Sequence, residues 1–317
     1  MTTAAPPPAL LAVDDATRLF EGDTGLRGVS LSLRAGAVYG LLGPNGAGKT
    51  SIIRAICGRL ALSAGRVQLD GRDPAADREA RRALGLVPQQ LALHRDLTVR
   101  ENLEVLGRLA GVSREAIADR VAWGLAWAGL EARAGDRTRT LSGGMQRRLN
   151  LVAGVLHEPR VLLLDEPTVG VDPDARLRVH ALLEQLRDGG MAILLTTHDL
   201  DEAARLSDTL GFLVDGRLRA EGTLPELVHA SFGTARHLEV VLEAAPEAPT
   251  VARLEALDLH ASQDPSRWLG RQAGGMESLA GIEQALTASG ARLRRVTLVE
   301  PGLREVFLQI TGRELDR

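Results

Sequence analysis

The sequence lacks the features that stabilise secreted and membrane-embedded proteins. It has one cysteine, Cys57, which cannot close an internal disulfide, so a disulfide-stapled secreted scaffold is excluded. No apolar run approaches the roughly 20 residues that a membrane-spanning helix needs. The segment Met1–Pro8 has neither the basic flank nor the apolar core of a signal peptide. We therefore expect a soluble intracellular protein.

The chain also lacks an excess of either charge, since 38 lysine and arginine residues face 41 acidic ones and the formal net charge is −3. Proteins that bind nucleic acid do so largely through clustered lysine and arginine, so no nucleic-acid partner is expected. Lysine itself is nearly absent, because Lys49 is the one lysine in the chain. An ammonium group differs chemically from a planar guanidinium, which makes Lys49 a candidate functional residue.

Apolar strands alternate with helices through most of the chain, which favours an α/β fold with a parallel sheet covered on both faces. Short apolar runs predict buried strands at Val38–Leu42, Leu84–Val87, Val161–Leu164 and Ala192–Leu195. Apolar periodicity predicts a helix at Thr50–Leu60, and the stretch from Thr98 to about Leu130 is expected to be almost all helix. The alternating segment Val13–Leu33 predicts an antiparallel hairpin.

The same patterns divide the chain into parts. Residues 1–12 are predicted to be a flexible tail, and residues 13–230 the main domain, with a helical subdomain at about 98–145. The alternation ends near Leu224, and residues 231–317 are predicted to form a small α+β carboxyl-terminal domain. In this domain we expect strands at Leu238–Leu242, Trp268–Arg271 and Arg292–Leu298, and helices at Thr250–Leu257, Ser278–Ala288 and Leu303–Thr311.

A glycine-rich segment after the first predicted buried strand fits the phosphate-binding loop pattern G-x-x-x-x-G-K-[ST]. Its residues are Gly43, Pro44, Asn45, Gly46, Ala47, Gly48, Lys49 and Thr50, followed by Ser51. The glycines let backbone N–H groups turn toward phosphate oxygens, and the helix that follows adds its positive end. Lys49 then supplies a cation to the outer phosphates, and the Thr50 hydroxyl is a ligand for Mg²⁺.

Two further segments carry candidate chemistry. The strand Val161–Leu164 ends in Asp165 and Glu166, at the edge of the sheet where ligands bind. Asp165 can hold Mg²⁺, and Glu166 can orient or polarise the attacking water of a phosphoryl transfer. In the segment Leu141–Gln146, Ser142 is a helix N-cap, and Gly143 and Gly144 expose bare amides at a second anion-binding helix start.

With these motifs in this order, the chain resembles the ATP-binding-cassette (ABC) ATPases from about Val13 to Leu227. The resemblance implies a P-loop NTPase fold with a mixed sheet core, an antiparallel β subdomain and a helical subdomain. It also implies that Gln89 meets Mg²⁺ and senses a membrane partner, and that His198 contacts the terminal phosphate. Asp172, in Val169–Asp172, would touch the opposite subunit. Phe20 would stack on adenine, where the family more often has tyrosine; the alternative is a core phenylalanine.

The resemblance also implies how the chain works. In the family, the segment that corresponds to Leu141–Gln146 is a signature segment, and it faces a different nucleotide from the phosphate loop of the same chain. One chain holds one of each, so two copies would assemble head to tail around ATP and Mg²⁺. Glu202-Ala203 and the tail Val299–Leu308 resemble the exporter branch that works with ABC-2 permeases. We expect the ATPase subunit of an exporter, held at the inner face of the cell membrane by a separate permease that docks near Leu91–Glu101. The alternatives are a soluble cassette without a transport role and the ATPase of an importer.

Overall fold

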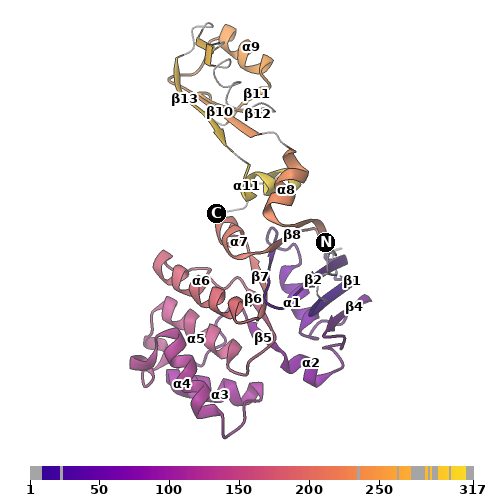
Figure 1. The fold of residues 1–317 in the computed structure, drawn as a ribbon, viewed down its shortest axis with the longest axis vertical. Coiled ribbons are helices and arrows are strands. Elements are labelled where there is room, and N and C mark those ends of the chain that lie inside the picture. The colour runs from indigo at the N-terminus through magenta and orange to yellow at the C-terminus, as the bar shows by residue number, and fades with distance from the viewer. Residues whose placement is uncertain are drawn as a thin grey trace, which may run out of the picture. The chain divides into compact units, whose positions relative to one another are not determined.

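The structure, a computed structural model, describes residues 9–21, 24–233, 236–262, 264–272, 283–284, 286–287, 292–299 and 301–311. The chain forms two compact units, of which the first runs to Thr223 and the second begins at Leu224 (Figure 1). The second unit thus begins before residue 231, where the sequence pattern placed the boundary. The first strand begins at Leu11, so the last two residues of the predicted tail lie in a sheet. Among the described residues, no helix is long and apolar enough to span a membrane.

The first unit is built on a six-stranded mixed sheet of order β5-β6-β7-β3-β8-β9. Its strands are β3 (Val38–Leu42), β5 (Leu84–Val87), β6 (Val161–Asp165), β7 (Ala192–Thr197), β8 (Thr209–Val214) and β9 (Arg217–Gly222). All neighbours pair in parallel except β8 and β9, which are antiparallel. Every residue of β3, β6 and β7 is buried, as expected for apolar strands covered on both faces. The four predicted buried strands are confirmed, whereas β8 and β9 were not predicted.

A smaller antiparallel sheet of order β2-β1-β4 completes the β structure of this unit. The predicted hairpin is confirmed as β1 (Leu11–Leu19) and β2 (Gly25–Leu33), and an unpredicted strand β4 (Ala64–Leu69) pairs with β1. Helix α1 (Lys49–Ile56) lies in the core that both sheets share, through Ile52 and Ile56. This helix ends well before Leu60, its predicted end.

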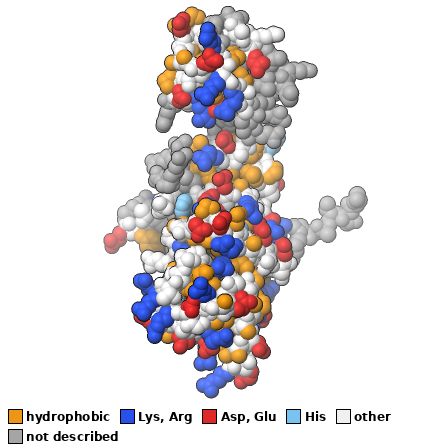
Figure 2. All heavy atoms as spheres, turned by 90° about the vertical axis from the view of Figure 1, so that its left-hand side faces the viewer, with side chains coloured by type: hydrophobic (Ala, Val, Ile, Leu, Met, Phe, Trp, Pro, Cys, Tyr) orange, Lys and Arg blue, Asp and Glu red, His pale blue; other side chains and the backbone are white. Residues whose placement is uncertain are grey.

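The described residues of the first unit form six further α-helices: α2 (Arg78–Arg82), α3 (Val99–Ala110), α4 (Ile117–Ala128), α5 (Gly143–Val155), α6 (Pro173–Asp188) and α7 (Leu200–Leu206). Most of the predicted helical stretch Thr98–Leu130 is helical, in two pieces, because α3 ends at Ala110 and its cap Gly111 has a φ of 100°. Helices α3, α4 and α5 share an apolar core of their own and lie on the side of the unit away from β1, β2 and β4 (Figure 1). Acidic and basic side chains are interspersed on the face shown in Figure 2.

The second unit contains an antiparallel sheet of order β11-β12-β10-β13, as expected for a small α+β domain. Its elements are α8 (Leu224–Phe232), β10 (Arg236–Leu242), α9 (Ala248–Ala256), β11 (Leu259–Ala261), β12 (Arg267–Gln272), β13 (Leu293–Val299) and α11 (Leu303–Thr311). Leu238, Val240, Leu254 and Trp268 form its apolar core. Most of the helix predicted at Ser278–Ala288 falls outside the described residues.

Candidate functional site

The glycine-rich loop joins the end of β3 to the start of α1, as the phosphate-loop pattern predicts. A Cβ atom on Gly43 would lie 2.2 Å from the backbone oxygen of Leu213, so only glycine fits there. Gly46 and Gly48 have φ values of 82° and 109°, in the left-handed region that favours glycine. Apart from Gly46 and its two chain neighbours, no heavy atom of the described residues lies within 4 Å of the place where a Cβ of Gly46 would be. The loop therefore leaves open space beside its backbone amides, which fits phosphate oxygens.

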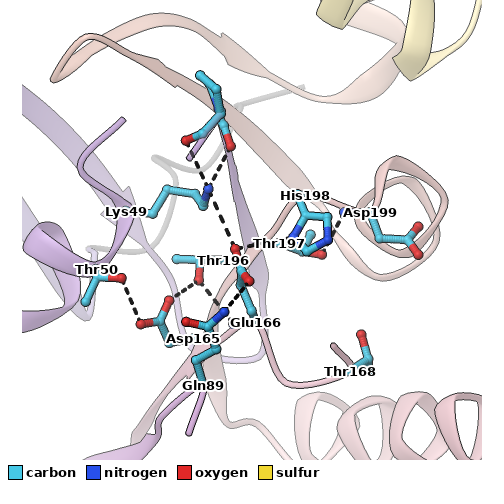
Figure 3. A network of polar contacts seen from close by, with 12 residues as sticks. Lys49, Thr50, Gln89, Asp165, Glu166, Thr168, Thr196, Thr197, His198 and Asp199 are labelled. Atoms are coloured by element: carbon cyan, nitrogen blue, oxygen red, sulfur yellow. Dashed lines mark hydrogen bonds and ion pairs between the residues drawn. The ribbon is translucent and has the colours of Figure 1, made fainter. Parts of the chain in front are cut away.

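Lys49 lies over this loop with its side chain buried. Its Nζ donates hydrogen bonds to the carbonyl oxygens of Gly43 (2.7 Å) and Pro44 (3.3 Å) and lies 3.8 Å from Glu166 Oε1 (Figure 3). Burial lowers the pKa of Lys49, and the carboxylates of Glu166 and Asp165 partly offset this effect. The ammonium group of the one lysine is thus held at the centre of the site.

Hard oxygen atoms gather beside the loop where β6 and β7 end. Asp165 pairs in register with Thr196 on β7 and accepts its hydroxyl hydrogen bond at 2.7 Å. The other Asp165 oxygen accepts a hydrogen bond from Thr50 Oγ1 at 3.0 Å. With Gln89, Thr50 and Asp165 line a cavity of about 520 Å³. In the part of the chain that the structure describes, no group of three or more histidine, cysteine or acidic side chains could hold a metal by itself.

Glu166 is the meeting point of three predicted site residues. Its Oε2 accepts a hydrogen bond from Gln89 Nε2 (2.8 Å), and its Oε1 lies 3.3 Å from His198 Nδ1 and 3.8 Å from Lys49 Nζ (Figure 3). The contact with His198 is close but lacks the geometry of a hydrogen bond. Glu166 also has a φ of 50°, a conformation that residues other than glycine adopt rarely and that recurs at functional sites.

The signature residues lie at the start of α5, with Ser142 and Gly143 exposed and Gly144 buried. Ser142 caps α5 by accepting a hydrogen bond from the Met145 amide at 3.3 Å, and Ser142 and Gly143 are exposed. Gly144 lets α5 approach α6, since a Cβ there would lie 2.5 Å from the Cβ of Ala175. Asp172 caps α6 by accepting a hydrogen bond from the Ala175 amide at 2.9 Å. Ser142 and Asp172 thus make these hydrogen bonds at the starts of their own helices.

Phe20 follows the last residue of β1 and is 42% exposed. Its ring lies 6.0 Å from the guanidinium carbon of Arg18. The alternative that Phe20 is a core phenylalanine is therefore wrong. An exposed aromatic face remains available for stacking on a planar base.

Two residues of the site were missed by the sequence reasoning. Arg147 on α5 donates hydrogen bonds to the backbone oxygens of Gln89 (2.6 Å) and Val169 (3.0 Å), and burial lowers its pKa. Arg147 thereby connects helix α5 to the backbone at Gln89 and at Val169. In a chain whose basic residues are almost all arginine, no signal distinguished Arg147. Thr196 could have been noticed as a hydroxyl group at the end of an apolar strand.

Comparisons with known proteins agree with this geometry. The family described as ABC transporter matches residues 26–169. A daunorubicin resistance ATP-binding protein of Streptomyces coeruleorubidus is 38% identical, over 95% of this chain and 96% of the relative. A Nod factor export ATP-binding protein of Ralstonia nicotianae is 37% identical, over 96% and 95%. A linearmycin resistance ATP-binding protein of Bacillus subtilis is 32% identical, over 96% and 99%.

Solved structures show the same fold. The ATP-binding subunit of an ABC transporter has a TM-score of 0.64 and 31% identity, covering 71% of this chain and 93% of its own. A dimeric ATP-binding cassette in a post-hydrolysis state, bound to ADP and Pi, has a TM-score of 0.60 and 26% identity, covering 67% and 98%. The resemblance inferred from the motifs is thus confirmed: the chain belongs to the ABC transporter family, as an ATP-hydrolysing subunit.

Proposed function

We propose that two copies of this chain close head to tail around ATP and Mg²⁺, and thereby drive a separately encoded membrane permease that exports its substrate. The observation that carries the proposal is the division of the site residues within one chain. Lys49, Thr50, Asp165 and Glu166 converge, whereas Ser142 and Gly143 are exposed at the start of α5, where Ser142 makes its hydrogen bond to its own helix. A second copy would bring its signature segment to the phosphates that the first copy holds.

In the proposed reaction, each side chain has a defined task. The loop amides and Lys49 bind the outer phosphates, and Glu166 accepts a proton from the attacking water. The water oxygen bonds to the γ-phosphorus while the bond to the β–γ bridging oxygen breaks, so that ADP leaves with the electron pair. His198, beside Glu166, contacts the terminal phosphate. Thr50, Asp165 and Gln89 supply the hard oxygen atoms for Mg²⁺, which when bound neutralises phosphate charge.

ATP would act as the contact between the two copies, since each nucleotide touches both. Loss of the γ-phosphate removes that contact, and the dimer opens. The dimeric relative bound to ADP and Pi supports a two-copy arrangement for cassettes of this fold. The relatives named for drug resistance and Nod factor export favour export over the importer and non-transport alternatives.

The segment proposed to meet the permease is held rigidly. Ala92 donates its amide hydrogen bond to Asn150 Oδ1 (3.1 Å), and His94 donates to Asn102 Oδ1 (2.8 Å). Asn102 is fully buried. Movement of Leu91–Glu101 under a permease helix would therefore be passed to Gln89, which contacts Glu166. Binding of the permease to this segment would hold the chain at the inner face of the membrane.

The proposal predicts a complex with a membrane protein. The gene next to this one should encode a protein with about six hydrophobic spans. Co-expression of the two genes should yield a detergent-solubilised complex with two copies of this chain, whose mass can be measured by light scattering. Reconstitution should raise the ATPase rate of the chain. A chain that never associates with any membrane protein, and instead co-purifies with ribosomes, would contradict the exporter assignment.

A further inference from the structure

Glu202 on α7 is a fully buried carboxylate that the proposed mechanism does not use. Its Oε1 accepts hydrogen bonds from Thr168 Oγ1 (2.7 Å) and His180 Nε2 (2.9 Å), and its Oε2 accepts one from Thr197 Oγ1 (2.6 Å). The side chain has no exposed surface. A carboxylate oxygen accepts hydrogen bonds, so His180 Nε2 carries the hydrogen in this contact, while His180 Nδ1 is buried and has no hydrogen-bond partner among the described residues.

The partners of Glu202 lie next to the residues that perform the reaction. Thr168 follows the end of β6, two positions after Glu166, and Thr197 is the last residue of β7, directly before His198. Figure 3 shows Thr168 and Thr197 on these two segments. Glu166 and His198 are themselves 3.3 Å apart. Beyond the pairing of β6 with β7, the two segments are therefore connected through the buried carboxylate, and the reacting side chains lie close together.

The chemistry of the buried group favours a role in orientation over a role in filling space. Burying a carboxylate is costly unless its oxygens receive hydrogen bonds, and an apolar side chain fills the same volume at lower cost. An ionised carboxylate accepts hydrogen bonds and cannot donate them, so it forces both threonine hydroxyls to point at it. Thr197 Oγ1 in turn accepts the Asp199 amide hydrogen bond at 3.0 Å, which fixes the backbone on both sides of His198.

We propose that Glu202 is a positioning residue for ATP hydrolysis, which holds the segments of Glu166 and His198 at their working separation through Thr168 and Thr197. The proposal rests on the proposed roles of Glu166 and His198. It also connects two functions, because Thr168 directly precedes the segment Val169–Asp172 that would face the opposite copy. Through its hydrogen bonds with Thr168 and Thr197, Glu202 connects Val169–Asp172 with His198.

The test removes the hydrogen bonds and keeps the shape. In the full-length chain, Thr197→Val and Thr168→Val should each lower kcat at least tenfold, while KM and the affinity for ATP stay within about twofold, because the phosphate loop is unchanged. Thr197→Ser and Thr168→Ser keep the hydroxyl and should restore most of the rate. Glu202→Gln should also lower kcat. The amide nitrogen donates hydrogen bonds, so a threonine hydroxyl that donates to Glu202 would have to accept one instead. Asp201→Asn, exposed on the same helix, is the matched control and should behave like wild type.

Thermal unfolding identifies the folded variants, and Glu202→Gln keeps the test valid if a valine variant does not fold. Wild-type kcat in folded Thr197→Val and Glu202→Gln chains would overturn the proposal, as would a change confined to KM. Glu166→Gln, measured alongside, separates the two levels of inference. If Glu166→Gln loses activity while Thr197→Val does not, only the role of Glu202 is overturned. If Glu166→Gln stays fully active, the proposed role of Glu166 is overturned as well.

Discussion

Replacing Glu166 with glutamine is expected to slow ATP hydrolysis by about 10²–10⁴-fold, the usual effect of losing a general base. The amide cannot take a proton from water, yet it has nearly the same shape as the carboxylate. Asp165 and Thr50, 3.0 Å apart, are unchanged by the substitution. Binding of Mg-ATP should therefore persist, and the rate of phosphate release measures the loss.

The same variant should accumulate as a closed dimer in the presence of ATP, because hydrolysis is the event that opens it. Size-exclusion chromatography with and without ATP distinguishes the two forms, with the wild-type chain as control. A Glu166→Gln chain that remains monomeric and hydrolyses ATP at the wild-type rate would remove Glu166 from its proposed role.

Lys49→Arg should lower the affinity for ATP by about 10–100-fold, the loss expected when a hydrogen bond to a charged group is removed. The Lys49 side chain is 7% exposed, and its Nζ lies between the carbonyl oxygens of Gly43 and Pro44. A planar guanidinium is too broad for this space, although the charge is kept. Isothermal titration with ATP measures the affinity. Arg78→Lys, a change at an exposed position on α2, is the control, and near-wild-type binding by Lys49→Arg would show that Lys49 does not contact the phosphates.

Sequence reasoning located site residues most directly where they stand next to one another in a short motif. The loop Gly43–Thr50 combines its glycines, lysine and threonine within one turn, and Asp165 and Glu166 follow directly on an apolar strand. Both segments could therefore be predicted with their surroundings. Their convergence also followed, because parallel strands end at the same edge of a sheet.

Contacts between distant segments could not be read in this way. Arg147 meets Gln89 and Val169 only because α5 packs beside both, and Glu202 meets Thr168 because β6 and β7 are adjacent. Strand β9 was missed because it is a polar edge strand, in which exposed and half-buried residues alternate. The break at Gly111 did have a signal, since glycine often ends a helix in the left-handed conformation.

Ser142→Arg tests the central claim, that one site is assembled from two chains. Ser142 is exposed and contacts its own helix start, so the substitution should leave the phosphate loop of the same chain intact. A bulky cation at this position should, however, prevent a second copy from closing over the nucleotide. Ser113→Arg, an exposed serine outside the site, provides the control for the added side chain.

The decisive measurement is ATP binding by the isolated Ser142→Arg chain, combined with its mass in the presence of ATP. The two-chain site predicts an ATP affinity within about twofold of wild type, which corresponds to a loss of less than about 0.4 kcal/mol of binding free energy. It also predicts no ATP-dependent dimer and no hydrolysis. Loss of ATP binding by the monomer would place the signature helix in its own chain's nucleotide pocket and contradict the head-to-tail arrangement.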